Sequence, residues 1–546
     1  MRHPRLLPEL VLACLGWLLS GHALADTPAP AVSGKTVAVP VRSQTFDILE
    51  IAVDGNTRLG EFEVQTVLEP FVGEQKKASD VDAARAALEQ LYKSRGYKTV
   101  SVSIPKQTIR DGLVLLQVTE GRVASLEVQD ARYSSLDQIK REVPSLAEGQ
   151  VPDFRAVEKD LAYANRLPNR RVIPTLSAGK EPGSVDIDLK VEDKLPLRLS
   201  TEINNRHGRD TTANRIVGTI GYDNLFQLGH SLTLSFQTAP QRTDDGSVYL
   251  GVYRAPLGDG SWNLSVVALR TSSNVSALGG VDVLGSGRSV GVELSKQLGV
   301  VGGKLYPSLA AGVDYKRFNT VASIGAGADV ETPAEYFPFS ISYSQLLRLE
   351  RHSLQNELSF NFASPQLGSN GAELDDNRFR ARGQMLFLRG SVDYRVELPA
   401  DLELGWRGNL QITDQPLISS EQFAAGGMDS VRGYLEAEAL GDYGYSSSVE
   451  LRGPSVPEYF ADTRLARVLT DFRPLVFVDA GNVRLRGPFS DNSSRRSSFL
   501  SSYGAGVSIQ LVDHITGSLF WAMPLHDGPA TPKHDNRLLF RFSASL

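Results

Sequence analysis

The chain has 546 residues, of which 41% are hydrophobic and 22% are charged, and its formal net charge at pH 7 is -6. A chain of this length is expected to form more than one domain, and its acidic balance argues against a general nucleic-acid-binding protein. The single cysteine, Cys14, lies in the N-terminal apolar run. We therefore exclude a disulfide framework and a thiol-based catalytic mechanism for the rest of the chain.

The N-terminus has the pattern of a secretory signal peptide. Arg2 and Arg5 precede the apolar run "LLPELVLACLGWLLSG", and residues 23–25 (Ala-Leu-Ala) form a small-residue cleavage pattern. The run is too short to span a membrane, and a proline and a glutamate interrupt it. We expect residues 1–25 to be removed on export.

Residues 26–45 are rich in proline and in small residues, which favours an extended linker over a helix. Pro28, Pro30 and Pro40 stand within this segment. Because proline removes a backbone donor and clashes with the preceding turn of a helix, we expect no stable helix here.

A first α+β unit is predicted over residues 46–120. It begins with the strand "FDILEIAVDGN", continues with a helix from about residue 59 to 71 and a second helix opened by Ser79, and ends with the strands "TVSVSIP" and "GLVLLQV". Apolar residues recur at helical spacing in the second helix, and Gly96 is placed to end it. The predicted order is β-α-α-β-β.

A second unit of the same order is predicted over residues 121–195. Its strands are "VASLEVQ", "RRVIPTL" and "SVDIDLKV", and its helices lie around residues 136–143 and 154–167. Each unit has about 75 residues, which is enough to fold when two helices cover one face of a sheet.

Short segments of alternating polarity fill residues 196–546. In "HSLQNELSFNF", for example, Leu354, Leu358, Phe360 and Phe362 share one face of a strand and polar residues occupy the other. A soluble sandwich would give the same alternation. The export signal, the many glycine, serine and aromatic residues and the final strand "RLLFRFSASL" favour an outer-membrane barrel, because only helices and closed barrels satisfy the backbone in lipid.

Residues 413–442 show no clear periodicity, and loops of this length are usually functional or disordered. They contain "QFAAGGMDSVRGY", in which Gly426, Gly427 and Gly433 permit tight turns and Arg432 offers a planar fork of donors. An arginine of this kind needs an acceptor. Asp479 supplies one, because alternation in "PLVFVDAGNV" places it on the inward face of a strand with residues 477 and 481.

The chain resembles a known family in several stretches. "VDGNTRL" and "YKSRGYKTVSVSIPKQTIRDGLVLLQVTEGRV" resemble the ShlB-type POTRA domain, and "NRLPNRRVIPTLSAGKEPGSVDIDLKV" resembles the second POTRA domain of the same proteins. These proteins are the two-partner secretion transporters, the TpsB branch (ShlB/FhaC/HecB-type) of the Omp85 superfamily. The resemblance implies two small α+β POTRA domains followed by a transmembrane antiparallel β-barrel of 16 strands.

The loop also matches the hallmark of that superfamily, the VRGY motif of the loop that follows the eleventh barrel strand and folds back into the lumen. By resemblance, the anchoring residues of the loop are Gly426, Gly427, Val431, Arg432, Gly433 and Tyr434. The second barrel motif of the family is matched around Asp479 and Gly481, which are expected to hold the loop against the wall.

The implied function is that of an outer-membrane translocator that captures an unfolded exoprotein in the periplasm through its POTRA domains and exports it through the barrel without ATP. The implied partners are a secreted exoprotein (an adhesin or a cytolysin), outer-membrane lipid, and the barrel assembly machinery and periplasmic chaperones during biogenesis. No nucleic acid, metal or other cofactor is expected. Well-known members also carry an N-terminal helix that plugs the pore. This chain is expected to differ, because the prolines of residues 26–45 disfavour a stable helix.

Other functions were weighed against this one. An Omp85-type barrel assembly factor would generally carry other POTRA sets, and a diffusion porin would not need periplasmic domains. A barrel enzyme would need a catalytic group, but the G-x-S-x-G match at Gly287–Gly291 leads into a strand pattern and not into a helix. The histidines after the signal show no metal-binding spacing: His207, His230, His352, His514, His526 and His534.

Overall fold

The computed structural model describes most of the chain after the linker, and the structural statements below concern the described residues. The expected signal peptide and residues 26–44 of the expected linker lie outside them. The described residues are 45–209, 211–272, 275–278, 281–324, 328–369, 371–378, 380–381, 383–457, 468–487, 496–512 and 514–546.

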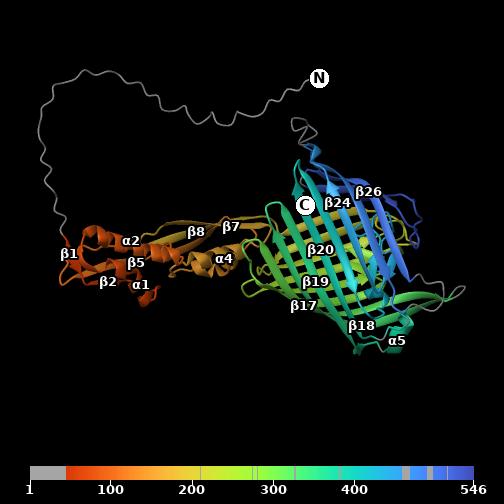
Figure 1. Ribbon diagram of the computed structural model, residues 1–546, viewed down its shortest axis with the longest axis horizontal. Coiled ribbons are helices and arrows are strands. Elements are labelled where there is room, and N and C mark those ends of the chain that lie inside the picture. The colour runs from red at the N-terminus through yellow and green to blue at the C-terminus, as the bar shows by residue number, and fades with distance from the viewer. Residues whose placement is uncertain are drawn as a thin grey trace, which may run out of the picture. The chain divides into compact units, whose positions relative to one another are not determined.

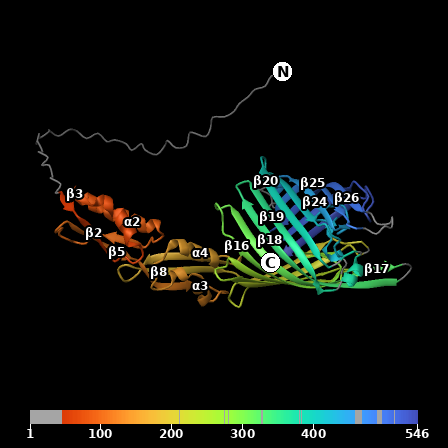
Figure 2. The same cartoon turned by 60° about the horizontal axis from the view of Figure 1, so that its bottom comes forward.

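The first α+β unit has the expected order with added short elements. Its elements are β1 (Phe46–Ile48), β2 (Glu50–Asp54), α1 (Glu61–Leu68), η1 (Glu69–Phe71), β3 (Gly73–Lys76), α2 (Ala78–Ser94), β4 (Val100–Ser103) and β5 (Leu113–Glu120). β2 and β4 are the edges of a three-stranded sheet with β5 in the middle, and β2 runs parallel to β5. Leu88 of α2 and Val114 and Leu116 of β5 are fully buried, so the helix covers the apolar face of the sheet (Figure 2).

Two details of this unit differ from the sequence prediction. The single expected strand "FDILEIAVDGN" is broken into β1 and β2, and β1 pairs with the unexpected strand β3. Helix α2 begins at Ala78, so Ser79 lies inside its first turn and does not cap it. Asp80 has the capping contact instead, because its carboxylate accepts a hydrogen bond from the N–H of Lys77 at 2.7 Å.

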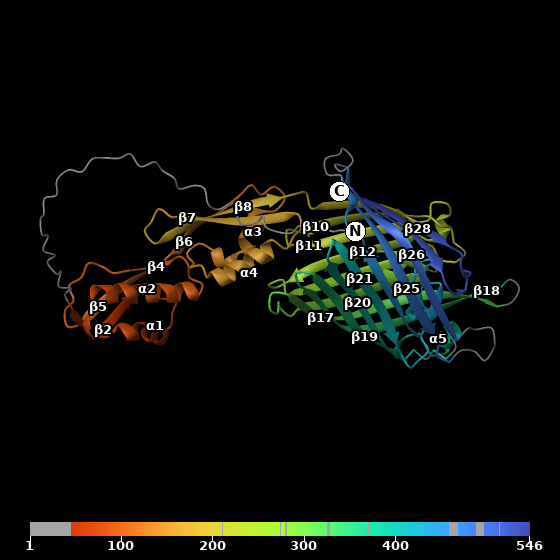
Figure 3. The same ribbon diagram turned by 45° about the horizontal axis from the view of Figure 1, so that its top comes forward.

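The second α+β unit follows its predicted order closely. Its elements are β6 (Arg122–Gln129), α3 (Leu136–Glu142), η2 (Pro144–Leu146), α4 (Phe154–Ala164), β7 (Arg170–Ala178) and β8 (Ser184–Asp193). β8 lies between β6 and β7, and α3 and α4 cover one face of this sheet (Figure 3). Ile139, Val157, Ile187 and Leu189 belong to its buried core. Ser135 caps α3 by accepting a hydrogen bond from the N–H of Gln138.

A closed barrel of 16 antiparallel strands follows, which confirms the predicted fold class (Figure 1). Each strand pairs with the next along the chain, apart from short hairpins, and the last strand pairs with the first. The strands are β9 (Leu197–Asn204), β10 (Arg215–Leu225), β11 (His230–Thr238), β12 (Val248–Leu257), β13 (Trp262–Thr271), β16 (Ser286–Gln297), β17 (Leu305–Ile324), β18 (Ala328–Arg348), β19 (His352–Gly368), β20 (Met385–Leu398), β21 (Leu402–Ile412), β24 (Tyr443–Arg452), β25 (Leu469–Arg484), β26 (Ser497–Leu511), β27 (Ile515–Pro524) and β28 (Arg537–Ser545).

The two faces of the barrel wall differ as the alternating sequence requires. On β25, Val476 and Val478 are 53% and 59% exposed, whereas Phe477 and Asp479 between them are buried. Successive side chains of a strand point to opposite faces, so the valines lie on the outer surface and the aspartate lies inside. Among the helices of the described residues, none is both long enough and apolar enough to cross a membrane.

Candidate functional site

The connection between β21 and β24, residues 413–442, folds against the inside of the barrel wall. It contains η4 (Ser419–Glu421) and a short hairpin of β22 (Phe423–Ala425) and β23 (Ala439–Gly441). These elements were not predicted, because three residues are too few to show periodicity. Along the barrel, this connection follows the eleventh strand.

Arg432 of this loop is almost fully buried, and its side chain donates four hydrogen bonds. Its Nε lies 2.8 Å from Oδ2 of Asp479, and its second terminal nitrogen lies 2.9 Å from Oδ1. The backbone N–H of Arg432 also donates to the same carboxylate, at 3.0 Å. The contact therefore has the bidentate geometry that a guanidinium forms with a carboxylate.

Two further groups on β24 receive the remaining donors of Arg432. One terminal nitrogen donates to Oε2 of Glu450 at 2.6 Å, and the other donates to Oγ of Ser448 at 2.9 Å. The guanidinium also lies over the ring of Phe477, with 3.4 Å between its carbon and the ring centre. The sequence interpretation missed Glu450 and Ser448. Their alternation in "YGYSSSVELRG" could have indicated that both face inward.

The charges of this cluster are balanced by a second arginine. Glu450 accepts from Nε of Arg452 at 2.7 Å through the oxygen that Arg432 does not use. Two carboxylates thus meet two guanidinium groups. Burial alone would lower the pKa of the loop residue Arg432, but its hydrogen bonds and ion pairs with Asp479 and Glu450 raise it instead, so the loop arginine remains charged.

The glycines of the motif allow the chain to turn where a side chain would clash. Gly426, Gly427 and Gly433 have φ values of 108°, 109° and 95°, which L side chains rarely adopt. A Cβ on Gly427 would also lie 2.4 Å from the carboxylate of Glu436. On the wall, Gly481 leaves room for the loop, because a Cβ there would be 3.0 Å from Val431.

The apolar motif residues pack beside the arginine. Val431 and Tyr434 belong to a buried cluster with Ala425, Val483 and Leu500. The hydroxyl of Tyr434 lies 2.8 Å from the carbonyl oxygen of His526 and 3.1 Å from that of Ser501. The structure thus places Arg432 against Asp479 and Val431 against Gly481, whereas Tyr434 contacts residues of other strands and turns.

The base of the loop has a separate polar anchor on other strands. The buried carboxylate of Glu421 is 2.7 Å from Nζ of Lys316, 2.7 Å from the hydroxyl of Tyr336 and 3.0 Å from a terminal nitrogen of Arg389. Burial alone would raise the pKa of Glu421, but the charges of Lys316 and Arg389 lower it to about 2. No local pattern marks these residues, because β17, β18 and β20 each contribute one of the partners.

A third contact holds the flank of the motif. Arg206, which follows β9, donates to both carboxylate oxygens of Glu436 and lies 2.7 Å from Asp429. A cavity of about 1010 Å³ remains between the loop and the wall, and polar residues such as Glu357, Asn361 and Asn409 line it. The loop therefore occupies part of the barrel interior, and both ionic contacts and buried apolar clusters hold it to the wall.

The weak catalytic signals of the sequence do not assemble into a site. Ser289 of the G-x-S-x-G match lies in β16, which pairs directly with β17, so no helix follows it. In the part of the chain that the structure describes, no group of three or more histidine, cysteine, aspartate or glutamate residues could hold a metal ion.

Two family models match the chain. The model "Haemolysin secretion/activation protein ShlB/FhaC/HecB" matches residues 183–509, which is more than half of the chain. The model "POTRA domain, ShlB-type" matches residues 46–121.

Individual proteins are more distantly similar. The outer membrane transporter CdiB of Escherichia coli is 26% identical over 212 residues, which are 39% of this chain and 35% of that protein. The match therefore spans about a third of that relative. The heme/hemopexin transporter protein HuxB of Haemophilus influenzae is 20% identical over 82% of this chain and 78% of its own length. A solved structure of CdiB from Escherichia coli has the same fold, with a TM-score of 0.63, 20% identity and coverage of 95% of this chain and 94% of that one.

Proposed function

The chain belongs to the ShlB/FhaC/HecB family of haemolysin secretion/activation proteins, and from this premise we propose that it exports an unfolded exoprotein by two-partner secretion. It is an outer-membrane protein whose POTRA domains lie in the periplasm. The exoprotein, an adhesin or a cytolysin, would cross the barrel and fold outside the cell. Folding there, and not ATP, would give the direction of transport.

The observation that carries this proposal is the way in which the loop occupies the barrel. Two buried apolar clusters join loop residues to the wall, and three ionic anchors, at Arg432, Glu421 and Arg206, hold the loop as well. The charged groups of these anchors can be hydrated when the lumen opens. We infer that the loop is a displaceable obstruction and that its motif residues anchor it.

Capture of the exoprotein would take place on the POTRA sheets. Each of the two sheets has three strands and therefore two edges, formed by β2 and β4 in the first sheet and by β6 and β7 in the second. An extended segment can add to such an edge through backbone hydrogen bonds. Binding of this kind depends little on the side chains of the bound segment, which suits an unfolded cargo.

The remaining roles follow from the same proposal. The protein would act as a translocator and not as an enzyme, since its family consists of transporters. Outer-membrane lipid would surround the barrel, the barrel assembly machinery and periplasmic chaperones would be its partners during biogenesis, and nucleic acid would not be a partner.

The test is a secretion assay with a candidate exoprotein, for which the neighbouring reading frames are the first place to search. Cells that express the exoprotein alone should retain it in the periplasm, and cells that also express the transporter should release it into the medium. Release at the same level without the transporter would refute the proposal.

A further inference from the structure

Three arginines lie side by side on the outer surface of the barrel. In the register of the strands, Arg270 of β13 is paired with Arg288 of β16, and Arg288 is paired with Arg317 of β17. Tyr249 of β12 continues the row next to Arg270. Directly paired residues share one face of a sheet, so the arginine row (Arg270, Arg288 and Arg317) forms one continuous strip.

The alternating burial of their neighbours shows which face the row occupies. Leu269 and Phe318, which are adjacent in sequence to Arg270 and Arg317, and Val248, which precedes Tyr249, are buried in a cluster on the inner side of the wall. Tyr249 is 53% exposed, and all three arginines are exposed as well. The row therefore points away from the lumen.

The position of the row along the strands places it at one border of the membrane. On β16 the outward residues after Arg288 are Val290, Val292 and Leu294, which are exposed and apolar, and Lys296 follows, with its Nζ 4.8 Å from the ring centre of Trp262. Eight residues separate Arg288 from Lys296, which is about 26 Å along a strand and about 20 Å along the axis of a tilted barrel strand. This is close to the height of the apolar band of an outer-membrane barrel.

The orientation follows from the order of the chain. β9 leaves the second POTRA domain, so the first barrel strand begins on the periplasmic side, and the strands alternate in direction from there. β13 therefore rises away from the periplasm and reaches Arg270 one residue before its end. The arginine row lies at the border with the outer leaflet, and Lys296 and Trp262 lie at the periplasmic border.

The arginine row has no partner among the described residues of the chain. No ion pair or hydrogen bond of the side chains of Arg270, Arg288 or Arg317 is formed with any residue that the structure describes. Glu335 of β18 stands opposite Arg317 in the register, yet the two form no ion pair within 4 Å among the described residues. Like charges placed directly opposite each other destabilise a sheet, and an arginine on the lipid-facing surface costs free energy that falls only towards the interface. Three adjacent cations at this border of the membrane would be stabilised by a bound anion.

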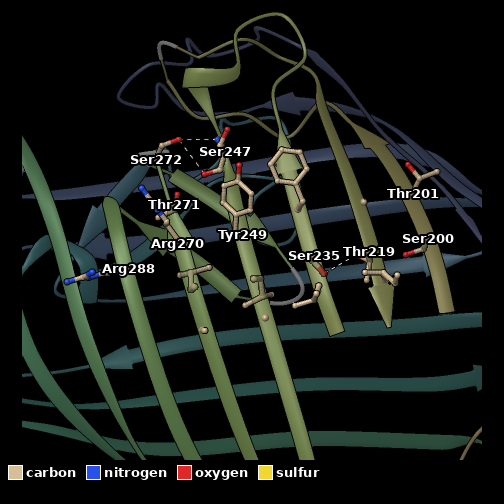
Figure 4. Close-up of a pocket in the computed structure, with 18 of the residues that line it drawn as sticks. Ser200, Thr201, Thr219, Ser235, Ser247, Tyr249, Arg270, Thr271, Ser272 and Arg288 are labelled. Atoms are coloured by element: carbon tan, nitrogen blue, oxygen red, sulfur yellow. Dashed lines mark hydrogen bonds between the residues drawn. The ribbon is translucent and has the colours of Figure 1, made fainter. Parts of the chain in front are cut away.

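We propose that the arginine row binds the phosphate-bearing headgroup of a lipid of the outer leaflet. Neighbouring strands are about 4.8 Å apart, so the three guanidinium groups span about 10 Å and can donate to more than one phosphate. Figure 4 shows Tyr249, Arg270 and Arg288 on successive strands, and the same cavity, of about 2020 Å³, is bordered by the apolar Ile220, Leu234 and Val290. These apolar residues fit acyl chains, which a soluble phosphate lacks.

This proposal rests on the location of the protein in the outer membrane and not on its secretion activity. The experiment uses the full-length mature protein in detergent micelles and measures its unfolding temperature from heat-modifiable gel mobility. The ligands are bisphosphorylated lipid A, the same lipid without phosphates, and inorganic phosphate. Wild type is compared with a row variant, Arg270→Gln, Arg288→Gln and Arg317→Gln combined. A charge-matched control carries Lys140→Gln, Arg141→Gln and Lys159→Gln, which change exposed residues of the second POTRA domain.

Bisphosphorylated lipid A should raise the unfolding temperature of wild type and of the control but not that of the row variant. The dephosphorylated lipid and inorganic phosphate should leave all three unchanged. If the row variant does not assemble, each single substitution should weaken the apparent affinity for the phosphorylated lipid about fivefold. An equal response in the row variant or in all the single variants, or an equal response to either of the other ligands, would overturn the proposal.

Discussion

The single residue Arg432 connects the loop to two strands of the barrel wall. Among its five hydrogen bonds to wall residues, three reach Asp479, one reaches Glu450 and one reaches Ser448. Strand parity predicted that the side chain of Asp479 points inward. The loop arginine was expected to need an acceptor, which Asp479 could supply. The sequence did not predict that Glu450 also accepts a hydrogen bond from Arg432, because strand parity shows which face of the sheet a side chain occupies but not how far it lies from another residue.

Replacing Arg432 by alanine should leave the barrel assembled but reduce secretion sharply. The substitution removes no strand pairing, yet it leaves the carboxylate of Asp479 buried without its partner and Glu450 with Arg452 alone, and the loss of a buried partner costs about 3–5 kcal/mol locally. Arg432→Lys should fail as well, since an ammonium cannot reproduce the bidentate contact. The measurement is cargo in the medium relative to heat-modifiable barrel in the outer membrane.

The wall residues should show the coupling expected of contacting groups. Asp479→Ala should resemble Arg432→Ala, and the double variant should be no worse than either single variant. Glu450→Gln should have a smaller effect, because Asp479 still receives most of the donors. Additive defects of Arg432→Ala and Asp479→Ala in the same secretion assay would mean that the two residues act independently.

At the scale of elements, the helices and strands of the second α+β unit were predictable because each is long enough to show its period. The break between β1 and β2 was not predictable, nor were β3, β22 and β23, since three or four residues carry no periodic signal. The contacts of Glu421 could not be predicted from the sequence for a different reason. Its partners Lys316, Tyr336 and Arg389 are far apart along the chain and meet only when the barrel closes.

The Glu421 anchor predicts a pH dependence of stability. The pKa of Glu421 is lowered from 4.5 to about 2 in the folded protein, so its contribution is full above pH 4.5 and is lost as the pH falls towards 2. The shift corresponds to about 3 kcal/mol, at about 1.4 kcal/mol per unit. Glu421→Gln should therefore lower the unfolding temperature at pH 7, and the difference from wild type should shrink below pH 4.5. A difference that is constant from pH 7 to pH 3 would argue against an ionised anchor.

At the scale of the whole molecule, the resemblance of a few stretches predicted both the fold class and the 16 strands of the barrel. Alternation alone did not give that number, because the strands differ widely in length. β9 has 8 residues, whereas β17 and β18 have 20 and 21, about twice the length that a membrane requires.

Deleting residues 46–193 tests the separate roles of the two regions. The POTRA units have their own buried cores, and the barrel closes through strands that begin only at Leu197. We expect the truncated protein to insert as a heat-modifiable barrel but to secrete no cargo. Secretion at the wild-type level would remove the POTRA capture step from the proposed function.

The central claim is that the cargo passes through a lumen from which the loop must move, and a reversible tether between loop and wall tests it most directly. A Cβ on Gly481 would lie 3.4 Å from the Cβ of Ala425 in the loop hairpin, close to the separation found in disulfides. No cysteine other than Cys14, in the expected signal peptide, competes for pairing. Ala425→Cys combined with Gly481→Cys should block secretion under oxidising conditions, and reduction should restore secretion to the level of the Gly481→Cys single variant, while the secretion of each single cysteine variant should not depend on the redox conditions. Undiminished secretion with the disulfide formed would contradict the account.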